Sequence, residues 1–283
     1  MLCFLILRKP FIVFLYVKDV LKKLGIKGGF RMIKATNLTK QYDNGFVAVD
    51  SLNLQVNKGD IYGFLGPNGA GKTTTIRMLN GLIEPSDGSV TIEDKEVKKE
   101  NASVSRLIGV LPESHGYYNW MTGREYLKLF AELYGVDKKR VKSRVEEVLE
   151  WVGMAGKADI PIGQYSRGMR QRIGIAKTIV HEPSIIFLDE PTLGLDPQGQ
   201  KDIQSIITRL NQEQNVTVFI TSHLLKEISE ICNRVAIVKQ GKLLEEGYLD
   251  ELITGYRLVL KNENPTLEDI FFSLTSDEVG GSI

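Results

Sequence analysis

One glycine-rich stretch of the chain has the residue types and spacing of a loop that grips phosphate. It fits the pattern G-x-x-x-x-G-K-[ST] and consists of Gly66, Pro67, Asn68, Gly69, Ala70, Gly71, Lys72 and Thr73. The glycines let the backbone curl so that successive N–H groups point at a β-phosphate, while Lys72 reaches the β- and γ-phosphate oxygens and Thr73 offers its hydroxyl to Mg²⁺. An apolar run at 61–65 precedes the loop and a helical pattern follows it, as the motif requires. The stretch therefore predicts a nucleotide-binding protein.

An acidic pair follows a second apolar run. Asp189 and Glu190 come directly after residues 185–188, which read as a buried parallel strand. Asp189 would hold Mg²⁺ through a bound water, and Glu190 would polarise the water that attacks the γ-phosphate. Such a pair taken alone is more often a surface feature, but the P-loop upstream favours the catalytic interpretation. We therefore expect nucleotide hydrolysis.

Ser222 and His223 come directly after a further strand-like run at 216–221. The His223 imidazole, at a strand end beside the nucleotide, could hydrogen-bond the γ-phosphate and report whether it is present. A lone histidine is more often structural, so this hypothesis depends on the other motifs.

Residues 165–172 open a helix that continues to 180, and we expect Ser166 to cap it. The free N–H groups of a capped helix start form an anion site. The chain then carries two phosphate-binding helix starts, and one nucleotide could use the second only from another subunit. This arrangement predicts a two-fold dimer with nucleotide between its halves.

The elements that must position these motifs can be traced along the chain. We expect strands at 33–36, 46–56, 61–65, 90–93, 185–188 and 216–221. We expect helices at about 138–154, 202–214, 224–232 and 266–274, one more that starts at the Thr122/Glu125 capping box, and a hairpin that turns at Gln240 and Gly241. Two helices between one α/β half and the next predict a helical subdomain inserted into a sheet-based core.

The composition is ordinary for a globular protein of 283 residues, with 42% hydrophobic and 25% charged residues. Lysine plus arginine (36) nearly cancels aspartate plus glutamate (35), and no basic cluster stands out, so we expect no nucleic-acid partner. The cysteines, Cys3 and Cys232, are interpreted as reduced residues, and the histidines lack metal-ligand spacing. From Met32 onward no run approaches the roughly 20 apolar residues that span a bilayer.

The order of the motifs resembles the ATP-binding cassette (ABC) of ABC transporters. The P-loop is followed by 165–169, 184–191, 194–197 and 222–223, and the resemblance covers Met32 to about Gly247. It implies an α/β fold with a P-loop NTPase (RecA-like) core, an antiparallel β subdomain, an α-helical subdomain inserted at about 114–180, and a short C-terminal tail at 248–283. It also implies ATP and Mg²⁺ as cofactors.

The resemblance assigns roles to individual residues. Tyr42 would stack on the adenine ring, and Lys72, Thr73 and Thr74 would hold the phosphates and Mg²⁺. The signature segment is 165–169, in which Ser166 and Gly168 would reach the γ-phosphate bound by the partner subunit, with Arg167 and Met169 as the further nucleotide-binding residues of the segment. Asp196 would be the D-loop residue, and His223 the switch histidine.

Two motifs depart from the family pattern. The signature reads Tyr-Ser-Arg-Gly-Met instead of Leu-Ser-Gly-Gly-Gln, so Arg167 adds a cation near the phosphates. Glu113 stands where the Q-loop glutamine is expected; a carboxylate still coordinates Mg²⁺ but lacks the N–H donor of an amide.

Both departures, together with residues 266–271, resemble the cassettes of ABC-2 type exporters, which pair with a separate membrane permease at the cytoplasmic face of the membrane. Glu113 and the run 115–122, with Tyr117, Tyr118 and Trp120, would then border the groove that receives the permease. The aromatic residues of this run could equally pack the helical lobe.

A rival interpretation is a soluble ABC ATPase that acts on nucleic acid or ribosomes. Such proteins generally carry two cassettes or a long coiled-coil insertion, whereas this chain has one P-loop and fewer than a hundred residues between it and Ser166. A P-loop kinase or GTPase would leave the signature and Ser222–His223 unexplained. The exporter subunit is favoured, and in this arrangement the permease selects the substrate.

Residues 1–31 are predicted to lie outside the working protein, because nothing before Met32 matches the family. Lys27-Gly28-Gly29 can be encoded by a purine-rich sequence that bacterial ribosomes pair with, at a suitable distance before the Met32 codon. The alternative is an amphipathic membrane anchor, since the apolar runs lie beside Arg8, Lys9 and Lys18. Mass spectrometry of the native N-terminus distinguishes the two.

Overall fold

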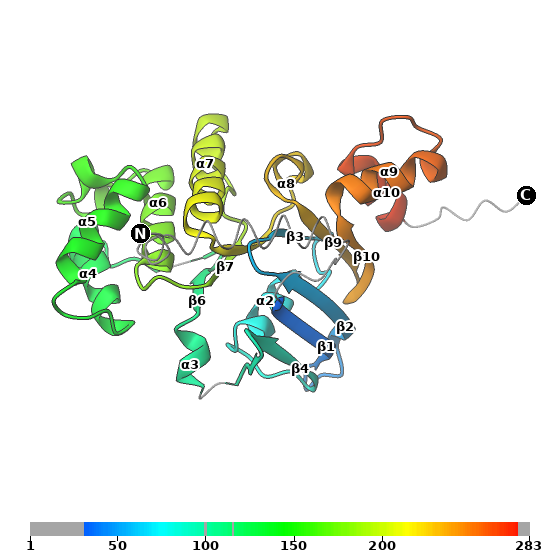
Figure 1. Cartoon of the computed structure of the whole chain (residues 1–283), viewed down its shortest axis with the longest axis horizontal. Coiled ribbons are helices and arrows are strands. Elements are labelled where there is room, and N and C mark those ends of the chain that lie inside the picture. Colours follow the sequence, from blue (N-terminus) through cyan, green and yellow to red (C-terminus); the bar gives the residue numbers. More distant parts are fainter. Residues whose placement is uncertain (1–30, 99–100, 115, 277–283) are drawn as a thin grey trace, which may run out of the picture.

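The computed structural model describes residues 31–98, 101–114 and 116–276. Residues 1–31, which are predicted to lie outside the working protein, are therefore not among the described residues except for Arg31, and neither is His115. The described chain forms two sheets with helices around them (Figure 1).

The larger sheet has six strands in the order β10-β9-β3-β8-β7-β6. Its strands are β3 (Ile61–Leu65), β6 (Ile108–Leu111), β7 (Ile185–Asp189), β8 (Thr217–Thr221), β9 (Arg234–Lys239) and β10 (Lys242–Tyr248). All neighbours in this sheet pair in parallel except β9 and β10, which form the predicted hairpin. Because parallel strands end at one edge, the segments after β3, β6, β7 and β8 are brought together there.

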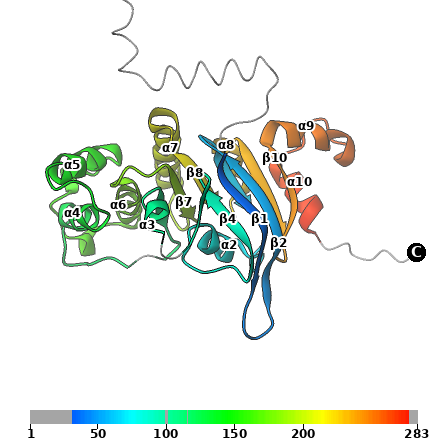
Figure 2. The same cartoon turned by 60° about the horizontal axis from the view of Figure 1, so that its bottom comes forward.

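The smaller sheet is antiparallel and has the order β2-β1-β4-β5. Its strands are β1 (Arg31–Gln41), β2 (Val47–Asn57), β4 (Asp87–Ile92) and β5 (Lys95–Glu96). This sheet lies below the larger one in Figure 1 and runs across its front in Figure 2. The predicted antiparallel β subdomain is present.

The core lies on both faces of the six-stranded sheet. Along β3, Ile61 and Leu65 join one apolar cluster, and Tyr62 and Phe64 join the other, as the two-residue period of a strand requires. The second cluster also contains the buried residues of β1, β2 and α2 (Lys72–Leu79), so the antiparallel sheet and α2 cover that face. The first cluster contains residues of α6 (Arg167–Ile179), α7 (Pro197–Gln214) and α8 (Leu225–Ile231).

The helical subdomain consists of α4 (Gly123–Leu133), α5 (Val141–Trp151) and α6, which lie together at one end of the molecule (Figure 1). A short helix, α3 (Ala102–Ser105), precedes β6. The predicted capping box is formed: the backbone N–H of Glu125 donates to Thr122 Oγ1, and that of Thr122 donates to the Glu125 carboxylate. The fold is that of a P-loop α/β core with an inserted helical subdomain, as predicted.

Helices α3, α7 and α9 differ from the expectation, and the short helix α3 was not predicted. Helix α7 begins at Pro197, five residues before the predicted start at 202, because the Asp196 side chain caps it and Pro197 fits the first turn. Helix α9 (Leu249–Leu260) was not predicted. Its first turns bury Leu249 and Leu252, but Leu258 and Val259 are exposed. The apolar residues of this helix therefore do not share one face, and the sequence lacks the helical periodicity that would have predicted it.

Helix α9 and α10 (Leu267–Thr275) cover the end of the first core cluster near β9 and β10. Leu267 and Ile270 are buried in that cluster, and Thr266 caps α10 with a second capping box. The described part of 248–276 is therefore packed on the core. Within the described residues, no helix combines the length and the apolar character that crossing a bilayer requires.

Candidate nucleotide-binding site

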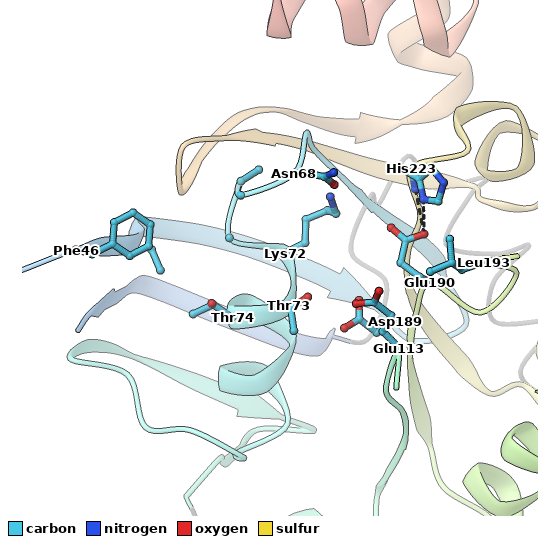
Figure 3. A pocket seen from close by; sticks show the side chains of 14 residues that line it. Phe46, Asn68, Lys72, Thr73, Thr74, Glu113, Asp189, Glu190, Leu193 and His223 are labelled. Atoms are coloured by element: carbon cyan, nitrogen blue, oxygen red, sulfur yellow. Dashed lines mark hydrogen bonds and ion pairs between the residues drawn. The ribbon is translucent and has the colours of Figure 1, made fainter. Parts of the chain in front are cut away.

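A cleft of about 550 Å³ lies at the carboxyl edge of the six-stranded sheet. Fourteen residues line it, most of them from the P-loop and from the segments that follow β6, β7 and β8 (Figure 3): Phe46, Ala48, Asn68, Gly69, Ala70, Gly71, Lys72, Thr73, Thr74, Glu113, Asp189, Glu190, Leu193 and His223. The cleft thus brings together the predicted P-loop, the acidic pair, Glu113 and the histidine. Gly66 and Pro67 precede the lining residues and contact Lys72 instead.

The P-loop is held tightly against its surroundings at two glycines. A Cβ at Gly66 would lie 2.5 Å from the Val238 carbonyl oxygen, and one at Gly71 would collide with the carbonyl oxygen of Ala48. Gly71 also has a φ of +94°, which disfavours other residues. It is the N-cap of α2 and supplies no side-chain cap. The first N–H groups of α2 are therefore available to an anion at the cleft.

Lys72 is folded back onto its own loop. Its Nζ donates to the carbonyl oxygens of Gly66, at 2.6 Å, and Pro67, at 3.2 Å. Burial lowers the pKa of Lys72, and the carboxylates of Glu190, Asp189 and Glu113 oppose that shift. A cation that is partly desolvated among loop carbonyls is well placed to exchange them for phosphate oxygens.

Asp189 and Glu113 supply carboxylates to the cleft, beside the hydroxyl of Thr73. Asp189 is buried at the end of β7, where Oδ1 accepts a hydrogen bond of 2.6 Å from Thr221 Oγ1 on β8. Figure 3 shows Asp189 and Glu113 at the end of the cleft away from Phe46. In the described chain, no group of three or more His, Cys, Asp or Glu side chains could hold a metal ion alone.

Glu190 and His223 are hydrogen-bonded to each other. The Nδ1 of His223 donates to Oε2 of Glu190 over 2.8 Å, and the His223 backbone N–H reaches the same oxygen at 3.3 Å. Glu190 has a φ of +51°, an uncommon conformation for a residue with a side chain. Its backbone N–H donates to the carbonyl and hydroxyl oxygens of Thr221, which fixes this turn. The strain is located at the residue predicted to be catalytic.

The signature residues do not line the cleft. Ser166 caps α6 as predicted, because its Oγ accepts the Met169 N–H at 3.2 Å. The Arg167 guanidinium lies against Gly194 in the segment after β7, where it would collide with any added Cβ. Met169 packs on the core, Gly168 has open space beside it, and Asp196 caps α7. In one chain the two predicted phosphate sites are separate.

The aromatic residue at the cleft is Phe46, whereas Tyr42 was predicted. Tyr42 does not line the cleft, although both residues lie at the tip of the β1–β2 hairpin, where the Tyr42 N–H donates to the Phe46 carbonyl at 2.9 Å. Figure 3 shows Phe46 at the opposite end of the cleft from His223. The sequence feature that could have indicated Phe46 is its position as a second aromatic residue in the same hairpin turn as Tyr42.

The aromatic run after Glu113 divides into packed and exposed members. Tyr117 packs: its hydroxyl donates to the Arg170 carbonyl at 2.7 Å, its ring lies 5.6 Å from that of Tyr126, and burial raises its pKa. Tyr118 and Trp120 are 43% and 76% exposed, with ring centroids 5.1 Å apart. Tyr117 thus packs the helical lobe, whereas Tyr118 and Trp120 are exposed, and their contact with a permease stays a prediction.

Comparison with known proteins identifies the family. The model of the ABC transporter family matches residues 49–193. The bacitracin transport ATP-binding protein BcrA of Bacillus licheniformis is 47% identical over 221 residues, which are 78% of this chain and 71% of that protein. The linearmycin resistance ATP-binding protein LnrL of Bacillus subtilis (strain 168) is 36% identical over 221 residues, 78% of this chain and 70% of that protein.

A solved structure gives the same result at the level of the fold. A dimeric ATP-binding cassette in a post-hydrolysis state, bound to ADP and Pi, superposes with a TM-score of 0.69 at 25% identity and covers 77% of this chain and 98% of its own. The predicted resemblance is confirmed: the chain belongs to the ABC transporter family, as one of its ATP-binding and ATP-hydrolysing cassettes.

Proposed function

We propose that the chain is the ATPase subunit of an ABC-2 type exporter and works as one half of a pair that closes around two ATP molecules. The observation that carries this proposal is the incompleteness of the site in one chain. Lys72, Glu190 and His223 share the cleft, whereas Ser166, at the start of α6, does not line it. A second copy or a paired cassette, related by a two-fold axis, supplies Ser166 to the γ-phosphate.

The lining residues fit a magnesium nucleotide. The hydroxyl of Thr73 and the carboxylates of Glu113 and Asp189 are hard oxygen donors, which Mg²⁺ prefers. Mg²⁺ keeps waters and phosphate oxygens in its shell, so a set this small suffices when ATP completes it. When bound, the ion offsets the negative charge of the β- and γ-phosphates.

Hydrolysis is assigned to Glu190 and His223. The Glu190 carboxylate accepts the proton of the attacking water and so activates it toward the γ-phosphate. His223 holds one oxygen of that carboxylate, and it lines the same cleft as Lys72. Lys72 and the N–H groups at the start of α2 hold the phosphates in place, which is the larger part of phosphoryl-transfer catalysis.

A separate integral-membrane permease is the proposed partner, with the cassette peripheral at the cytoplasmic face. Tyr118 and Trp120, exposed on the helical subdomain close in sequence to Glu113, are the proposed contact. In this scheme residues 32–247 form the ATPase domain, with the helical subdomain at about 114–180, and 248–283 follow it. Export is supported by the names of the relatives, which concern bacitracin transport and linearmycin resistance.

Mixing two inactive variants tests the shared site. Lys72→Ala removes the phosphate grip, and Ser166→Arg blocks the signature. A mixed dimer has one site with both parts intact, which neither variant can form alone. We expect ATPase activity to return on mixing, in step with the fraction of mixed dimers. Full activity of Ser166→Arg by itself would contradict the composite site.

A further inference from the structure

Helix α8 carries a glutamate, Glu227, that is hydrogen-bonded to the turn containing Glu190. Glu227 is half-buried in the first turn of α8, four residues after His223. Its Oε2 accepts a hydrogen bond of 2.5 Å from the hydroxyl of Thr192, a residue that is 2% exposed. Thr192 follows Glu190 by two residues. The bond therefore joins the segment after β7 to the helix that follows β8.

This bond is the outermost of a series between the two segments. Asp189 and Thr221 are paired in the sheet and also bonded through their side chains. Beyond the sheet, Glu190 is bonded to Thr221 and His223. Thr192 and Glu227 come next. Glu190, in its left-handed conformation, is thus held on both sides: by Thr221 at its own N–H, and by the Thr192–Glu227 bond two residues later.

The burial of the Glu227 carboxylate has a cost in free energy. Oε1 of Glu227 is buried and lacks a hydrogen-bond partner among the described residues. Burial raises the pKa of Glu227, and the nearby carboxylates of Glu230 and Glu190 act in the same direction, while Thr192 and His223 oppose them. A carboxylate that only packed the helix would be replaced by an apolar side chain at no loss. Here one oxygen of the carboxylate accepts from a buried hydroxyl, which an apolar side chain could not do.

We infer that Glu227 is a positioning residue for ATP hydrolysis, which acts through Thr192 to fix the turn that carries Glu190 relative to His223. The inference rests on the proposed ATPase function. Glu227 does not line the cleft. Loss of the bond should therefore slow the chemical step and leave the grip on the phosphates unchanged.

The test measures kcat and KM for MgATP on the purified full chain. Thr192→Val removes the hydroxyl at constant volume, and Glu227→Ala removes the acceptor. We expect each to lower kcat roughly tenfold, the size of effect that follows the loss of one strong hydrogen bond, with KM within about twofold of wild type. Thr192→Ser and Glu227→Gln keep a donor and an acceptor and should retain most of kcat.

The double variant separates a shared bond from two independent effects. Thr192→Val combined with Glu227→Ala should be no slower than the slower single variant, since both changes break one interaction. Glu230→Ala removes an exposed carboxylate from the same helix and should leave kcat unchanged. If Glu227→Ala does not fold, Thr192→Val and its serine counterpart decide the question.

Three results would overturn the inference: wild-type kcat in Thr192→Val, additive losses in the double variant, or a raised KM at constant kcat. Each presupposes a wild-type chain that hydrolyses ATP. A wild-type chain that binds MgATP but never turns it over, alone or with its permease, contradicts the proposed function instead.

Discussion

The His223 imidazole and the Glu190 carboxylate form one hydrogen-bonded pair, with Nδ1 and Oε2 2.8 Å apart. The His223 backbone N–H reaches the same carboxylate oxygen, so His223 holds one side of the group. The other oxygen, Oε1, has no hydrogen-bond partner in the described part of the chain. A carboxylate fixed on one side and available on the other has the arrangement that a water-activating base needs.

The first prediction concerns that base. Glu190→Gln should keep the affinity for ATP, because Lys72 and the P-loop are untouched, and should lower turnover at least about a hundredfold, because an amide cannot take the proton. ATP should then trap the dimer, which size-exclusion chromatography with MgATP would detect. Glu230→Gln, on exposed α8 surface, is the matched control. Wild-type turnover in Glu190→Gln would remove Glu190 from its assigned role.

Features that depend on residues close together in the sequence could be predicted. Four cleft residues each follow an apolar strand by a few residues, and parallel strands bring their carboxyl ends together: Lys72, Asp189, Glu190 and His223. Local sequence therefore predicted that these residues meet at one edge of the sheet. The same holds for the Thr122 and Ser166 caps, which depend on residues three positions away.

Contacts between distant residues were not predictable in this way. Thr192 and Glu227 are 35 residues apart and meet only because α8 returns beside the segment after β7. Phe46 rather than Tyr42 lines the cleft because of how the hairpin tip folds, which no periodicity encodes. The contact of Arg167 with Gly194 likewise depends on the packing of α6 beside the start of α7.

The second prediction separates the two aromatic residues of the hairpin. Phe46→Ala should raise the KM for ATP on the order of tenfold, since base–aromatic stacking contributes about 1–3 kcal/mol. Tyr42→Ala should have a smaller effect, because Phe46 lines the cleft and Tyr42 does not. Both should leave kcat near the wild-type value. A larger effect of Tyr42→Ala would mean that the hairpin tip rearranges on binding ATP.

The third prediction concerns the signature arginine. Arg167 is the first residue of α6, whose first turn contains no acidic side chain, so its charge adds to the positive end of the helix dipole. The Arg167 charge and the positive end of the helix repel each other, and a phosphate bound in the partner's site would relieve this repulsion. Added salt screens such an attraction. In the ATP-bound Glu190→Gln dimer, the dimer fraction should therefore fall less steeply with salt concentration when Arg167→Gln is also present than when it is absent.

Arg257→Gln, which removes one positive charge from α9, should leave that salt dependence unchanged and serves as the control. Dimer fraction measured by size-exclusion chromatography over a range of NaCl concentrations provides the comparison. Equal slopes for Arg167→Gln and its parent would place Arg167 away from the nucleotide.

The last prediction is a pH dependence of stability that originates at His181. Its Nε2 lies 3.0 Å from the Ile108 carbonyl oxygen, its ring is 4.4 Å from that of Tyr134, and its Nδ1 is buried without a partner among the described residues. Burial lowers the pKa of His181 below the ordinary 6.5, and the charge of Arg144 lowers it further, while the bond to Ile108 opposes both.

The sign follows from which state binds the proton first. As the pH falls below 6.5, the unfolded chain takes up a proton at His181 before the folded chain does, so folding stability declines. The contribution is complete above 6.5 and is lost as the pH falls through the folded-state pKa. His181→Gln, whose amide nitrogen takes the place of Nε2 and can still donate to the Ile108 carbonyl, should flatten the fall in melting temperature between neutral and mildly acidic pH. Tyr134→Phe keeps the ring beside His181 and should preserve the wild-type slope; an unchanged slope in His181→Gln would assign the acid sensitivity to other groups.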